Sequence, residues 1–259
     1  MSEVNLQNNQ TMSGTLTSST LESIKSNYQR TLDRIFNAAQ KAGRNPNQVR
    51  LVVVTKTHPV EVVEAAVLAG AAHIGESYAD EAISKIAQLA GKSITWHMIG
   101  HVQSRKAAAV STNFDYLHSL DSLKLAKRLN HFCKEAGRTL PFLFECNVSG
   151  ETTKTGFSAW EERRWQALLP VFDEILTLEH LKCQGLMTIA PFFDKPEETR
   201  PYFRKLRALR DFLDKQFRSV CFDELSMGMS GDFEAAIQEG ATWVRIGTAI
   251  LGERLSRKG

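Results

Sequence analysis

Lys56 ends a short apolar run, VVVTK, and its position suits covalent chemistry. If a lysine at the end of a buried strand is partly desolvated, desolvation can lower its pKa, and the neutral amine can then attack a carbonyl carbon to form a Schiff base. The alternative is an ordinary solvated lysine at a strand end, because charged side chains mostly lie at protein surfaces. Position alone leaves both interpretations open.

Two glycine-containing segments near the C-terminus favour a ligand site. Residues 225–232 (LSMGMSGD) lead from a short apolar run into a helical pattern, and residues 245–248 (RIGT) lie in the last apolar run. Small residues let the backbone approach a ligand closely, and backbone amides at the start of a helix point toward an anion. Together with Lys56, these segments predict a lysine able to form a Schiff base beside a phosphate site.

Arg245 alternates with Trp243 and Gly247 on one face of the predicted last strand. An arginine inside a strand is costly unless hydrogen bonds or charges satisfy it. One interpretation is a structural ion pair with a carboxylate on another strand, such as Glu145 or Glu76. The other is a hydrogen bond to a bound ligand, and the sequence pattern fits both.

A metal site is not expected. His97 and His101 have the spacing of helical metal ligands, but their segment resembles a strand, which would separate them by about 13 Å. The four cysteines are widely spaced and form no CxxC pair: Cys133, Cys146, Cys183 and Cys221. Such spacing favours reduced, structural thiols.

Eight short apolar or β-branched runs alternate with helical patterns along the chain. The runs span residues 49–56, 72–75, 95–100, 116–120, 141–148, 183–189, 224–228 and 243–251. This alternation indicates a parallel sheet with right-handed connections. Eight such units match an α/β fold of the (β/α)8 TIM barrel type, which usually has about 250 residues, and a doubly wound open sheet is the alternative. In a barrel, ligands bind at the carboxyl ends of the strands, where Lys56 and the two glycine-containing segments lie.

Ahead of the first strand, an apolar stripe from Leu21 to Ala39 predicts an extra N-terminal helix, with a capping box at Ser19 and Glu22. The first 20 residues contain 13 Ser, Thr, Asn or Gln. We therefore predict a disordered polar tail over residues 1–20 and a barrel domain over residues 21–259.

The composition is that of a globular protein, with 42% hydrophobic and 24% charged residues. The 32 basic and 29 acidic residues are intermixed without a basic block, so nucleic acid is not an expected partner. No apolar run approaches the roughly 20 residues of a membrane span. These features predict a cytoplasmic protein without a membrane partner.

Several motifs resemble those of the pyridoxal phosphate homeostasis proteins, whose barrel is similar to the N-terminal domain of alanine racemase. The motifs are residues 54–57 (VTKT), 74–78 (IGESY), 96–106 (WHMIGHVQSRK), 147–149 (NVS), 154–156 (KTG), 185–187 (GLM), 225–230 (LSMGMS) and 245–250 (RIGTAI). The resemblance extends from about residue 20 to the end of the chain. Taken together, the motifs are highly specific.

The resemblance implies a barrel that holds pyridoxal 5′-phosphate (PLP) as a Schiff base on Lys56. It also implies that Ser230, Gly247 and Thr248 hold the phosphate and that Arg245 approaches the pyridine nitrogen. A cation at that place disfavours protonation of the nitrogen, which weakens the ring as an electron sink.

Three positions depart from the family pattern. The family usually has Asn where this chain has Ser77, and often has Pro and Asn where it has His101 and Arg105. Serine is shorter than asparagine and has no amide, so Ser77 is not part of the predicted site.

The function implied by the resemblance is PLP binding and a role in intracellular vitamin B6 and amino-acid homeostasis, without efficient catalysis. The expected partners are PLP and PLP-dependent apo-enzymes, and the expected state is a monomer. A low-activity PLP-dependent amino-acid racemase is the alternative. Racemisation needs an acid–base group on each face of the α-carbon. In alanine racemases the second group is a tyrosine of an additional β domain, which we expect this chain to lack.

A Schiff-base aldolase acting on sugar phosphates is a third hypothesis. It predicts that Lys56 forms a Schiff base with the substrate itself, without a coloured cofactor.

Overall fold

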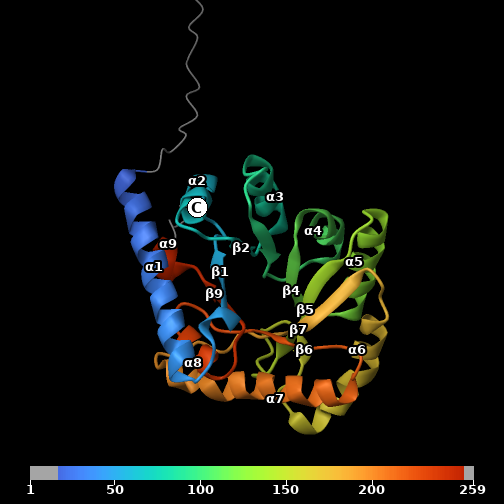
Figure 1. Ribbon diagram of the computed structural model, residues 1–259. Helices are drawn as coiled ribbons and strands as arrows, with labels where there is room; N and C mark the ends of the chain where they lie inside the picture. Colours follow the sequence, from blue (N-terminus) through green and yellow to red (C-terminus); the bar gives the residue numbers. More distant parts are fainter. Residues whose placement is uncertain (1–16, 254–259) are drawn as a thin grey trace, which may run out of the picture.

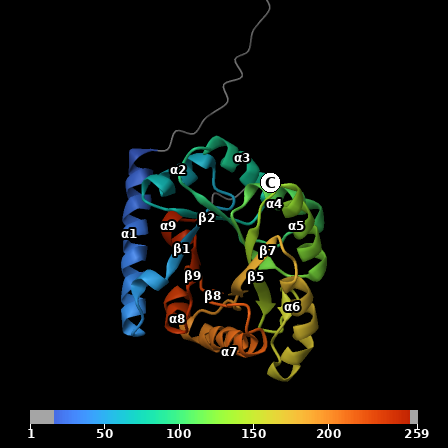
Figure 2. The ribbon, with the colours of Figure 1, turned by 45° about the vertical axis from the view of Figure 1, so that its right-hand side comes forward.

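The computed structural model describes residues 17–253. The eight barrel strands are β1 (Arg50–Val54), β2 (His73–Glu76), β3 (Thr95–Met98), β4 (Tyr116–Leu120), β5 (Leu140–Asn147), β7 (Leu181–Met187), β8 (Glu224–Ser226) and β9 (Trp243–Ile246). Neighbours pair in parallel in this order, and β9 pairs with β1 to close the ring. The closed ring confirms the predicted (β/α)8 TIM barrel and excludes the open sheet (Figures 1 and 2). A short β6 (Phe157–Ser158) pairs with the end of β5.

Helices surround the ring of strands, as Figure 2 shows. The α-helices after the first strand are α2 (Val60–Leu68), α3 (Ala79–Gln88), α4 (Ala107–Asn113), α5 (Leu123–Glu135), α6 (Leu169–Leu176), α7 (Arg200–Gln216), α8 (Phe233–Gln238) and α9 (Thr248–Leu251). Short 3-10 helices are η1 (Pro46–Gln48), η2 (Ser104–Lys106), η3 (Glu162–Leu168) and η4 (Pro196–Thr199). An α-helix follows each of the first seven barrel strands, as predicted.

The N-terminal helix α1 (Ser18–Lys41) lies outside the barrel ring, against α2, α8 and α9. Its cap is Thr17, whose hydroxyl accepts a hydrogen bond from the backbone of Thr20, so the capping box predicted at Ser19 is wrong. The helix starts at Ser18, three residues before the predicted domain boundary. Residues 1–16 of the predicted tail lie outside the described residues.

Side chains of each strand alternate between the helical layer and the barrel interior. On the outer side, Phe144 of β5 stacks on Phe172 of α6 with 4.0 Å between ring centroids. The interior toward the amino-terminal end of the strands is polar and aromatic instead: Arg50, His73, His97, Tyr116, His118 and Trp243 meet there. Branched aliphatic residues usually fill this place in TIM barrels.

None of the helices within residues 17–253 combines the length and the apolar character that crossing a membrane requires.

Candidate functional site

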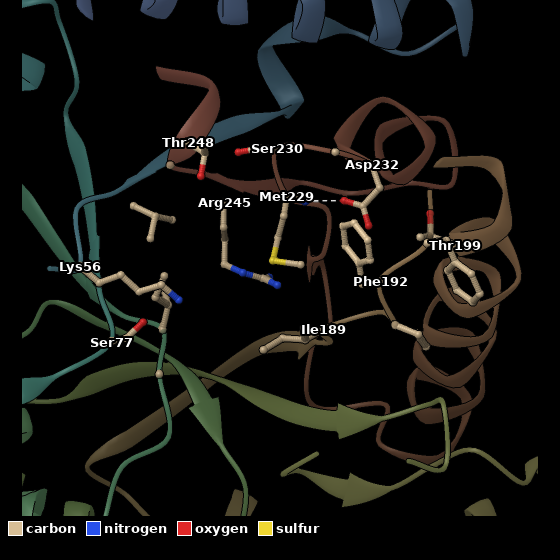
Figure 3. A pocket seen from close by; sticks show the side chains of 17 residues that line it. Lys56, Ser77, Ile189, Phe192, Thr199, Met229, Ser230, Asp232, Arg245 and Thr248 are labelled. Carbon is tan, nitrogen blue, oxygen red and sulfur yellow. Dashed lines mark hydrogen bonds between the residues drawn. The ribbon is translucent and has the colours of Figure 1, made fainter. Parts of the chain in front are cut away.

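A pocket of about 360 Å³ opens at the carboxyl ends of the barrel strands (Figure 3). Its size lies in the range of small-molecule sites. The five predicted site residues all line it, although they come from three separate segments, after β1, after β8, and from β9 to the start of α9: Lys56, Ser230, Arg245, Gly247 and Thr248. The fold therefore brings together the lysine, the arginine and both glycine-containing segments.

Lys56 lies two residues after the end of β1, and its side chain extends into the pocket (Figure 3). The next residue, Thr57, has a φ of 65°, in the left-handed region that non-glycine residues rarely adopt. Such a conformation is strained and persists only where surrounding contacts hold it. One of those contacts is the Thr57 backbone N–H, which donates to Glu81 Oε1 over 2.7 Å.

A buried ion-pair cluster fixes the backbone on the other side of Lys56. The Lys85 ammonium donates to the Thr55 carbonyl oxygen at 3.0 Å, to Glu76 at 2.8 Å and to Glu81 at 2.6 Å. The Thr55 hydroxyl also donates to Glu76, at 2.6 Å. Burial raises the pKa of Glu76, while Lys85 and Thr55 counteract this by favouring the carboxylate. The cluster thus holds the chain immediately before and after the pocket lysine.

Arg245 lies on β9 with its side chain in the barrel interior and is only 4% exposed. Its guanidinium donates to Ser226 Oγ at 2.6 Å and to the Thr188 carbonyl oxygen at 2.9 Å. Burial lowers its pKa to about 10, so it stays charged at neutral pH. The two carboxylates considered as structural partners bond elsewhere, Glu76 to Lys85 and Glu145 to Thr155.

The two glycine-containing segments are joined at the pocket wall. Ser230 Oγ accepts a hydrogen bond from the backbone N–H of Ala249, which ties the loop after β8 to α9. The loop turns at Gly228, where φ is +93° and a Cβ would approach the Cβ of Ala236 to 2.6 Å. Asp232 accepts from the Met229 N–H at 2.6 Å and closes the turn before α8. The residues of these two segments that line this side of the pocket include Ser230, Gly231, Gly247 and Thr248.

The sequence interpretation did not identify the apolar wall of the pocket. This wall contains Ile189, Pro191, Phe192 and Phe193 from the segment after β7, and Met229. Phe192 is 91% exposed, which is unusual for a phenylalanine. The aromatic pair following a predicted strand was the available signal. Ser77, which was not part of the predicted site, also lines the pocket.

His97 and His101 do not come together. His97 is fully buried in the barrel interior, while His101 bonds to Asp121 at 2.6 Å near the strand ends. The four cysteines are unpaired thiols, two of them buried.

The pocket thus combines three chemistries. A primary amine lies on one side, a buried cation at the base, and hydroxyl groups with close backbone approach on a third side. This set can take a molecule with a carbonyl carbon, a hydrogen-bond acceptor and an anionic group.

Comparison with known proteins places these observations in a family context. The profile of the alanine racemase N-terminal domain matches residues 21–255. The pyridoxal phosphate homeostasis protein of Aquifex aeolicus is 40% identical over 225 residues, covering 87% of this chain and 96% of its own. The structure of PipY from Synechococcus elongatus with PLP bound superposes with a TM-score of 0.74 at 34% identity, covering 88% of this chain and all of the other (100%).

Full-length alanine racemase shares the fold alone. The enzyme of Clostridium difficile matches with a TM-score of 0.66 at 19% identity, and the match covers 92% of this chain but 57% of the racemase.

Proposed function

This chain belongs to the alanine racemase N-terminal domain family, among the pyridoxal phosphate homeostasis proteins, and we propose that it binds and sequesters PLP inside the cell. The observation that carries the proposal is the pocket with Lys56, Arg245 and the Ser230–Thr248 wall in one cavity. The PLP-bound relative PipY supports it, because its fold matches this chain over the whole of its own length.

The donor set of the pocket fits PLP part by part. The aldehyde requires an amine, and Lys56 supplies it; a C=N bond forms and water leaves. The phosphate requires neutral donors and close backbone approach, which Ser230, Gly247 and Thr248 offer. The pyridine nitrogen requires a donor or a charge, and Arg245 is a buried cation that lines the pocket.

When bound, PLP supplies an electron sink whose strength depends on the protonation of its ring nitrogen. Arg245 is a donor without an acceptor atom, and its charge disfavours a proton on a nitrogen beside it. A carboxylate at this position would do the opposite. Arg245 therefore weakens the sink, which fits a protein that holds PLP rather than one that uses it for rapid catalysis.

We propose that efficient catalysis is absent. None of the pocket-lining residues is a tyrosine, although all four tyrosines lie within residues 17–253. The pocket therefore offers no tyrosine to act as the second acid–base group that an alanine racemase uses on the opposite face of the α-carbon. Solvent deuterium incorporation at the α-carbon of amino acids tests this: we expect no exchange at useful turnover, and multiple turnovers per minute with any amino acid would establish a racemase-like activity.

In the cell, the proposed role is control of the free PLP pool, with PLP-dependent apo-enzymes as recipients. Deleting the gene should raise B6 vitamer levels or cause sensitivity to pyridoxine. The wild-type gene should return both to normal, and a gene carrying Lys56→Ala should not. Normal pools and normal sensitivity in the deletion strain would contradict the role. We further propose a monomer, which sedimentation at several protein concentrations can test.

A further inference from the structure

A chain of hydrogen bonds runs from Arg245 through the barrel interior toward the amino-terminal end of the strands. The steps are Arg245 Nη1 to Ser226 Oγ at 2.6 Å, Ser226 Oγ to His118 Nδ1 at 2.8 Å, His118 Nε2 to His97 Nδ1 at 2.9 Å and His97 Nε2 to His73 Nδ1 at 3.1 Å. We call His73, His97, His118 and Ser226 the histidine relay. Its members come from β2, β3, β4 and β8, so only the closed barrel assembles it.

The arginine sets the direction of every bond in the relay. A guanidinium has donors only, so Ser226 Oγ accepts from Arg245 and its own hydrogen is available for His118 Nδ1. His118 then carries its proton on Nε2 and donates to His97 Nδ1. His97 does the same toward His73. In the opposite direction, His118 Nδ1–H would donate to Ser226 Oγ, which already accepts a hydrogen bond from Arg245. The Ser226 hydroxyl hydrogen would then need another acceptor.

The rings are held neutral in this arrangement. His97 and His118 are completely buried, and burial lowers the pKa of both well below the ordinary histidine value. The nearby charged and titratable groups that face the rings are Arg245 at one end and Arg50, Glu224 and Tyr116 at the other. Arg50 is paired with Glu224, so the far end of the relay carries a neutralised pair.

Arg245 is buried and no carboxylate is hydrogen-bonded to it, although the charges of Asp232 and Glu145 lie near enough to favour the cation. Within residues 17–253 its hydrogen bonds go to a hydroxyl and a carbonyl, and no ion pair forms with it. A buried charge is costly unless surrounding groups compensate it. In the assigned direction, every imidazole turns its lone pair toward Arg245, so the aligned ring dipoles favour the cation.

We propose that His118 and His97, acting through Ser226, are positioning residues that hold the Arg245 guanidinium against the ring nitrogen of the bound cofactor. This inference rests on the proposed PLP function. The relay takes the place that a carboxylate would occupy, and it compensates the arginine without drawing it into an ion pair.

The first test needs no cofactor. Nitrogen-15 NMR of the histidine rings in the purified full chain, before PLP is added, reports which ring nitrogen carries the proton. We expect His97 and His118 to be neutral at pH 7 with the proton on Nε2. A proton on Nδ1 of either ring, or a doubly protonated ring, would overturn the relay.

The second test uses PLP labelled with nitrogen-15 in the ring. In the wild type the ring nitrogen signal should be that of an unprotonated pyridine. In His118→Phe the signal should move toward the protonated position, because Arg245 is no longer held against the ring nitrogen. PLP affinity should fall roughly tenfold, the size expected when the hydrogen bond between the charged Arg245 and the ring nitrogen is lost. His118→Asn keeps an acceptor for the Ser226 hydroxyl and should restore the wild-type signal.

Ser226→Ala repeats the test with the loss of a single oxygen if the phenylalanine does not fold. Ser111→Ala is its matched control, because Ser111 is also fully buried but bonds to Leu129 on another part of the barrel. Wild-type signals and affinity in both His118→Phe and Ser226→Ala would contradict the proposal. If the wild type itself binds no PLP, the proposed function fails, while the histidine NMR still decides whether the relay exists.

Discussion

At the scale of single residues, the pocket depends on side chains that never enter it. Lys56 is flanked by Thr55, whose carbonyl accepts from Lys85, and by Thr57, whose strained backbone is held by Glu81. An amine that must meet an aldehyde at one angle gains from a fixed backbone, because orientation lowers the barrier to bond formation.

Glu81→Gln tests this support. The amide keeps an oxygen for the Thr57 N–H but removes the charge that pairs with Lys85. The free energy of unfolding should fall by about 1 to 2 kcal/mol, and Schiff-base formation with added PLP should slow. Urea denaturation and stopped-flow absorbance measure the two effects. Glu64→Gln breaks an exposed pair with Lys92 and should change neither by a measurable amount.

Glu145 should make stability depend on pH. Burial raises its pKa, so the folded state binds a proton that the unfolded state has already released. Its contribution is therefore unfavourable above the unfolded pKa and grows as the pH rises toward the folded value. Glu145→Gln should stabilise the protein more at pH 8 than at pH 5. The exposed Glu174→Gln should show no such difference, and an equal effect of Glu145→Gln at both pH values would contradict the assignment.

At the scale of elements, α1 supports the two helices, α8 and α9, that adjoin the predicted phosphate side of the pocket. Its Asn27 side chain donates to the Ile250 carbonyl oxygen of α9 at 3.1 Å, and Arg34 pairs with Glu234 of α8. The predicted phosphate residues lie in the loop before α8 and at the start of α9. By holding these two helices, α1 fixes the position of this pocket wall, although no residue of α1 lines the pocket.

Two adjacent apolar residues of α1 differ in burial and so test whether the helix packs against the barrel. Ile35 is 4% exposed and Phe36 is 48% exposed. Ile35→Ala should lower the free energy of unfolding by about 2 to 4 kcal/mol, because it leaves a cavity between α1 and the barrel. Phe36→Ala should stay within about 0.5 kcal/mol of the wild type. Equal losses in urea denaturation would show that α1 does not pack as described.

At the scale of the whole molecule, the strand–helix alternation predicted a parallel sheet and left the barrel and the open sheet as alternatives, of which the structure shows the barrel. The rule that ligands bind at the strand ends located the pocket. Residues that meet across the barrel could not be predicted in this way. His73, His97 and His118 lie on three strands, and His97 was considered only as a metal ligand. Which inward side chains touch depends on the closure and register of the ring, which no local pattern records.

The apolar wall was missed for a related reason. Phe192 follows β7 in a loop, and its place across the pocket from Lys56 follows from the closure of the barrel.

The most direct test of the PLP-binding account is the absorption spectrum of the purified protein with PLP, before and after borohydride, beside Lys56→Ala. The wild type should show a visible Schiff-base band that reduction abolishes. Mass spectrometry should then find the reduced PLP adduct on the peptide that contains Lys56. Lys56→Ala should lack or shift the band, whereas the surface variant Lys92→Ala should retain it. A wild-type protein without any band after PLP addition would contradict the account and favour a Schiff-base aldolase.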